Sequence, residues 1–86
     1  MKRWREPDGL HLDLRGLEPP EPMVAVLGEI NAGTNEPMIL HMDRDPIFLY
    51  AELEERGWSG RRVSENDVAE EGGPAVIIEL KPETRS

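Results

Sequence analysis

The chain contains no cysteine among its 86 residues. This absence excludes disulfide bonds, a thiolate nucleophile and a zinc site built from cysteine ligands. It also fits a reducing compartment, and we expect a cytoplasmic location. Aromatic residues are scarce as well, at 5% of the chain. Any chemistry that the protein performs must therefore come from its other polar side chains.

Long apolar runs and an excess of positive charge are also missing. No stretch approaches the roughly 18 consecutive apolar residues of a membrane-spanning helix. The basic start, Met1–Pro7, is not followed by the apolar stretch of a signal peptide. The formal net charge is -8, from 18 acidic and 10 basic side chains. Because such a field repels phosphate groups, we expect neither a nucleic acid nor a membrane as partner.

The length of the chain limits what it can enclose. A chain of this size buries only about 60–65% of the surface of its unfolded state. It can form one modest core, with no depth for an enclosed active site. We expect a single domain over residues 9–81, a flexible N-terminal tail at 1–8 and a C-terminal tail at 82–86.

Four strands are predicted from the pattern of apolar residues. Leu10, Leu12 and Leu14 alternate with polar residues, which is typical of a strand with one buried face. The same alternation predicts a second strand at 38–43. Two more strands are predicted, one around 61–64 and one at 75–81.

Two helices are predicted between these strands. The first has apolar residues at the spacing i, i+3, i+4 and i+7, namely Met23, Val26, Leu27 and Ile30. It ends near Asn31 and Gly33. The second begins with Asp45 as N-cap and Pro46 at the first helical position, and it stops at Gly57.

The order β-α-β-α-β-β predicts an α/β two-layer sandwich. Right-handed crossovers between parallel strands place both helices on one face of a four-stranded mixed sheet. The last two strands are expected to pair antiparallel. The other face of the sheet is then left open.

Two histidines and two aspartates are expected on this open face. His11 and Asp13 alternate with the leucines of the first strand, and His41 and Asp43 follow the same alternation in the second. If the two strands are neighbours, these four side chains form a candidate site for a divalent metal ion. The alternatives are a pH-sensitive surface or two exposed histidines among solvated acids.

Other residues are candidates for contact with a partner. Ile39 and Ile77 also alternate onto the open face, where an apolar patch is typical of a protein interface. Trp4 lies among basic residues and is expected to dock on a partner, to fold back on the body or to end a disordered tail. Trp58 is expected to cover the sheet edge. Arg15 is expected to pair with a nearby glutamate, Glu18 or Glu21, or to bind a ligand carboxylate.

Three motifs carry a resemblance to known families. They are Leu12–Pro22, His41–Tyr50 and Glu52–Trp58. The strand followed by a proline-rich helix start resembles the TusA/SirA sulfur-carrier proteins. Those proteins have Cys-Pro-x-Pro where this chain has Pro19–Pro22, so the carrier thiol is replaced by Pro19. More closely, the chain resembles a bacterial domain family of unknown function with the same fold, except that Phe48 replaces a proline of the middle motif.

These observations leave two functions open. The first is a non-enzymatic interaction module for a protein partner or a second copy of the chain. The resemblance implies a setting in bacterial sulfur, nitrogen or redox metabolism. The alternative is a small metal- or cofactor-binding domain that uses His11, Asp13, His41 and Asp43. An enzyme is not expected, because the chain lacks a phosphate-binding loop and a serine–histidine motif.

Overall fold

The computed structural model describes residues 1–44, 46–63 and 76–83. Within these ranges the elements are β1 (Lys2–Glu6), β2 (Gly9–Asp13), α1 (Glu21–Asn31), β3 (Met38–Met42), α2 (Ile47–Glu55), β4 (Trp58–Arg62) and β5 (Val76–Pro82). The strands form one open sheet in the order β1-β2-β3-β5-β4. The protein is therefore an α+β domain with two layers.

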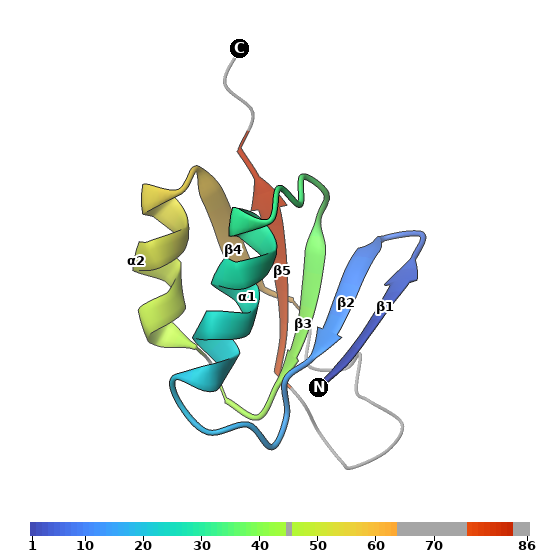
Figure 1. Ribbon diagram of the computed structural model, residues 1–86, viewed down its shortest axis with the longest axis vertical. Coiled ribbons are helices and arrows are strands. Elements are labelled where there is room, and N and C mark those ends of the chain that lie inside the picture. Colours follow the sequence, from blue (N-terminus) through green and yellow to red (C-terminus); the bar gives the residue numbers. More distant parts are fainter. Residues whose placement is uncertain (45, 64–75, 84–86) are drawn as a thin grey trace.

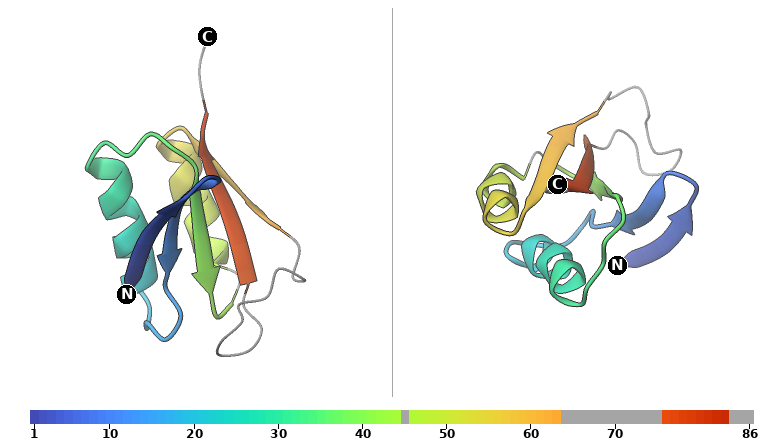
Figure 2. Two further views of the ribbon diagram at one scale, coloured as in Figure 1. Left: turned by 90° about the vertical axis from the view of Figure 1, so that its right-hand side faces the viewer. Right: turned by 90° about the horizontal axis from the view of Figure 1, so that it is seen from above.

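Both helices lie on the same face of the sheet, as Figure 1 and Figure 2 show. β2 and β3 are parallel neighbours, and α1 makes the crossover between them. The other neighbouring pairs are antiparallel, including β4 with β5. β5 lies between β3 and β4, so the second crossover skips one strand position. The mixed sheet with two helices and the antiparallel last pair are as predicted.

The N-terminal segment is a strand, and the prediction of a flexible tail at 1–8 is wrong. β1 pairs antiparallel with β2, which gives the sheet five strands where four were predicted. Arg3 donates to Glu29 of α1 at 2.8 Å, and Arg5 donates to Glu36. Because Arg3 and Arg5 make ion pairs and Trp4 is the single apolar residue of the strand, it lacks the apolar alternation by which strands are recognised.

Two predicted boundaries also move. β4 begins at Trp58 rather than near residue 61, and Trp58 is buried in the core at 4% exposure. α2 begins at Ile47, with Pro46 before the helix rather than at its first position. Asp45, Ser64, Ala75 and residues 84–86 lie outside the described residues, so the predicted cap at Asp45 is not described.

The main core lies between the helices and the sheet. Its buried side chains include Leu10, Leu12 and Leu14, each at most 1% exposed, as their alternation predicted. Val26 of α1 and Leu53 of α2 are fully buried against them. Burying a large aliphatic side chain contributes about 1.5–3 kcal/mol. This packing fixes which residues β2 and β3 present on the opposite, open face.

Candidate functional site

The two predicted histidines meet on the open face. Nε2 of His41, on β3, lies 2.9 Å from Nδ1 of His11, on β2. Nε2 of His11 lies 2.7 Å from Oδ1 of Asp8, in the turn between β1 and β2. Since a carboxylate only accepts hydrogen bonds, His11 donates through Nε2 to Asp8. In the neutral tautomer of His11, Nδ1 accepts the Nε2–H of His41, and the contacts define a continuous Asp8–His11–His41 chain.

The side chain of Trp4 covers the hydrogen-bonded Asp8–His11–His41 chain. Its ring stacks on His11, with centroids 5.1 Å apart and an interplanar angle of 24°. It also lies 5.3 Å from the ring of His41. The indole N–H donates to the Glu6 carboxylate at 2.6 Å. Trp4 was expected to dock on a partner, to fold back on the body or to end a disordered tail, and the structure shows that it folds back on the body.

The two histidines are largely shielded from solvent. His11 is 7% exposed and is the one buried polar residue within the described ranges. Burial and then the neighbouring His11 ring lower the pKa of His41 below its ordinary value, against a raising contribution from Asp13. The imidazole of His41 is thus held toward its neutral form, which is the form that hydrogen-bonds to His11 and ligates metals.

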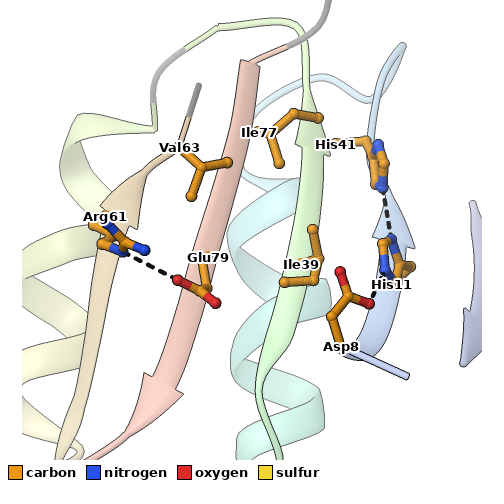
Figure 3. Close-up of a pocket in the computed structure, with 8 residues that line it drawn as sticks. All are labelled: Asp8, His11, Ile39, His41, Arg61, Val63, Ile77 and Glu79. Atoms are coloured by element: carbon orange, nitrogen blue, oxygen red, sulfur yellow. Dashed lines mark hydrogen bonds and ion pairs between the residues drawn. The ribbon is translucent and has the colours of Figure 1, made fainter. Parts of the chain in front are cut away.

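A shallow hollow of about 290 Å³ lies beside the histidines on the open face. Its lining residues are Asp8, His11, Ile39, His41, Arg61, Val63, Ile77 and Glu79. Figure 3 shows the histidines and Asp8 on one side and the Arg61–Glu79 ion pair with Val63 on the other, with Ile39 and Ile77 between. Arg61 donates to Glu79 at 3.0 Å. The hollow combines an apolar floor with charged and titratable walls.

The two predicted aspartates are engaged elsewhere. Asp13 accepts from Nε and from the second guanidinium nitrogen of Arg15, both at 2.9 Å. These bonds lower the pKa of Asp13 to about 2. Asp43 accepts the backbone N–H of Gly16 at 2.7 Å. The four predicted metal ligands therefore do not share one cluster, because an arginine and a loop amide compete for the carboxylates.

Arg15 also differs from its predicted pairing. Its ion pair is with Asp13, two residues earlier, rather than with Glu18 or Glu21. Asp13 ends β2 and Arg15 follows two residues later, so the two side chains form a bidentate pair without any distant part of the chain. The carboxylates near the start of α1 are thus not needed to neutralise it.

Ile39 and Ile77 do lie together on the open face, as their alternation predicted. They form a small second cluster with Val63 and are 6% and 5% exposed. They form the floor of the hollow rather than a broad exposed patch.

The sequence reasoning missed three acids near the site, which are Glu6, Asp8 and Glu79. The dipeptide Asp8-Gly9 carries a signal that reveals two of them, since Asp-Gly is typical of hairpin turns. A hairpin at that point places Glu6 and Asp8 next to His11. The carboxylate oxygens of Glu6 and Asp8 and a ring nitrogen of His11 all lie within 4.8 Å of one another.

No helix within the described residues is long and apolar enough to cross a membrane.

The fold and the site together define a small two-layer α+β protein with a polar, histidine-containing hollow on its open sheet face. The chain belongs to the family described as uncharacterized conserved protein (DUF2249), whose family model matches residues 11–75. This agrees with the predicted membership in a domain family of unknown function. Searches among curated proteins and among solved structures found no match.

Proposed function

We propose that this protein is a small, cytoplasmic, non-enzymatic binding module that docks a protein partner on the open face of its sheet. The observation that carries this proposal is the hollow between the Asp8–His11–His41 chain and the Arg61–Glu79 pair. An apolar floor with a polar rim is the arrangement that buries one anchoring side chain of a partner.

The charge distribution supports a partner with cationic and apolar side chains. Acidic residues outnumber basic ones by eight. Several arginines pair with carboxylates of the same chain, as in the Arg3–Glu29, Arg5–Glu36 and Arg56–Glu52 pairs. Complementary potentials favour the encounter with a basic surface and disfavour association of two like-charged copies.

The shape of the site favours binding over catalysis. Asp8 and His11 are directed at a second imidazole rather than at a hydroxyl nucleophile. The hollow is also open to solvent, which weakens electrostatic stabilisation of a transition state. Apart from β1, the element order and the one-sided helices support a TusA/SirA-like fold, and with it a setting in bacterial sulfur, nitrogen or redox metabolism.

The test compares proteins captured from the native host by three immobilised forms of the chain. Val63→Lys places a long cationic side chain at a half-buried position of the hollow, where it fills the space of an anchoring side chain and repels a cationic partner. Circular dichroism verifies its fold. Phe48→Gln is the control, because Phe48 is 82% exposed and belongs to the helix layer. We expect one partner to bind the wild type and Phe48→Gln equally, and to be reduced at least tenfold with Val63→Lys.

Loss of the partner with Phe48→Gln and its retention with Val63→Lys would place docking on the helices and contradict the proposal. Light scattering of the purified protein checks the remaining alternative. A stable dimer that dissociates on Val63→Lys identifies the partner as a second copy of the chain.

A further inference from the structure

We infer that Glu6, Asp8 and His11 form a binding site for one divalent first-row metal ion at the turn of the β1–β2 hairpin. Their ligand atoms lie within 4.8 Å of one another, so small side-chain movements bring one nitrogen and two oxygens around an ion. An imidazole with two carboxylates suits zinc, manganese or iron. This inference goes beyond the docking surface and does not depend on it.

The histidine of this group is buried and oriented from outside the group. The His11 side chain is 9% exposed and lies under the stacked ring of Trp4. Burying a polar ring away from water costs free energy unless its nitrogens have hydrogen-bond partners. The partner of its far nitrogen, Nδ1, is Nε2 of His41 at 2.9 Å. A metal-bound histidine characteristically has its second nitrogen held in this way, which fixes the ring and the tautomer.

With both rings in a neutral tautomer, binding needs only an exchange of tautomers. In the metal-free chain, the Nε2–H of His11 faces Asp8 and the Nε2–H of His41 faces His11. In the metal-bound chain, Nε2 of His11 binds the ion and its Nδ1–H donates to His41. His41 then carries its proton on Nδ1. His41 acts as a positioning residue rather than as a ligand.

The backbone around the ligands is held in place. Gly9 has φ of +136°, and a Cβ atom there would lie 2.3 Å from the carbonyl oxygen of Pro37. The next amide, that of Leu10, donates to the same oxygen at 2.9 Å. Only glycine fits this close approach. The start of β2, next to the turn that carries Asp8, is thereby fixed against Pro37, the residue before β3.

Charge and access also suit a divalent cation. Two carboxylates with a neutral imidazole supply two negative charges, and Glu6 and Asp8 are both exposed. The indole N–H of Trp4 holds one oxygen of Glu6. A carboxylate has a second oxygen for a ligand. Three protein ligands leave coordination positions open for water.

The test is titration of Zn²⁺ and of Mn²⁺, each alone, into untagged, metal-stripped full-length protein by calorimetry. We expect one ion per chain, with affinity reduced at least 100-fold by Asp8→Asn and by Glu6→Gln. Both variants change exposed side chains, and circular dichroism verifies their fold. Glu54→Gln and Glu55→Gln remove the same formal charge from exposed positions on α2 and are expected to bind as the wild type does.

His41→Gln tests the positioning role separately. We expect its stoichiometry to stay at one ion, with affinity reduced about 10–100-fold. Binding that is absent in the wild type, or unchanged in both Asp8→Asn and Glu6→Gln, would overturn the inference. Repeating the partner capture in the presence of a chelator separates the two proposals, because docking on the hollow is expected to persist without the ion.

Discussion

The carboxylate of Asp43 accepts a 2.7 Å hydrogen bond from the backbone N–H of Gly16. This bond joins the loop after β3 to the loop after β2, at the carboxyl ends of the two parallel strands. A second bond, from Leu14 N–H to the His41 carbonyl, continues the strand pairing beside it. The role of Asp43 is thus to hold the two loops together.

Asp43→Ala is expected to lower the free energy of unfolding by about 1–2 kcal/mol, because the Gly16 amide loses a charge-assisted partner. Urea denaturation followed by circular dichroism measures the change. Glu54→Ala, an exposed position on α2, is the control and is expected to lie within about 0.5 kcal/mol of the wild type. Equal stability of the two variants would show that the loop bond contributes nothing.

Gly60→Ala and Gly28→Ala are expected to change stability in opposite directions. A Cβ at Gly60 would lie 2.8 Å from Leu80 Cδ2 and 3.1 Å from Leu53 Cδ1. Overpacking of this kind costs about 1–3 kcal/mol. A Cβ at Gly28, within α1, meets nothing within 4 Å, so the alanine adds about 0.5–1 kcal/mol of stability. Thermal unfolding of the two variants checks this, and a destabilised Gly28→Ala would contradict it.

The order of helices and strands after residue 9 could be predicted because burial imposes its period on the sequence. Leu10, Leu12 and Leu14 alternate since one face of β2 packs against the helices. β1 could not be found in this way. Its inward contacts are made by Arg3 and Arg5, whose partners lie far along the chain. Ion pairs between distant residues leave no local period.

The same distinction explains what was predicted of the site. His11 and His41 were expected on one face of neighbouring strands, and they are in contact there. Of their expected companions, Asp13 has the correct strand phase but pairs with Arg15, and Asp43 follows the end of β3 and accepts from the Gly16 amide. The alternation along a strand predicts the face of the sheet from which a side chain projects. The hydrogen-bond partners nearby determine where its charged end lies. Asp8 reaches the site from the turn between β1 and β2, and the alternation of apolar residues in strands says nothing about a turn.

Phe48 and Leu49 are adjacent in the sequence and are expected to respond very differently to alanine. Leu49 is 2% exposed and packs in the core, whereas Phe48 is 82% exposed. Leu49→Ala is expected to cost about 2–5 kcal/mol, because it leaves a cavity. Phe48→Ala is expected to change stability by less than about 0.5 kcal/mol. Urea titration of both variants measures this, and a large loss with Phe48→Ala would mean that the side chain is buried in solution.

Glu29 is expected to make stability depend on pH, because it anchors β1 to α1. The hydrogen bond from Arg3 lowers the pKa of Glu29 below its ordinary value of 4.5, and the Thr34 hydroxyl adds to this. A carboxyl group whose pKa is lower in the folded state stabilises the fold above its unfolded pKa. That contribution is lost as the pH falls from about 4.5 through the lower folded value.

Glu29→Gln is therefore expected to be less stable than the wild type at pH 7, with a difference that shrinks steadily below about pH 4.5. Urea denaturation at several pH values, at constant low salt, measures the difference. Added salt is expected to reduce it at pH 7, because Arg3 is 48% exposed and the pair is open to screening. Glu55→Gln removes the same charge from the exposed side of α2 and is the control. A gap between the wild type and Glu29→Gln that stays constant from pH 7 to pH 3 would mean that packing of the side chain, rather than its ionised pair with Arg3, holds β1 against α1.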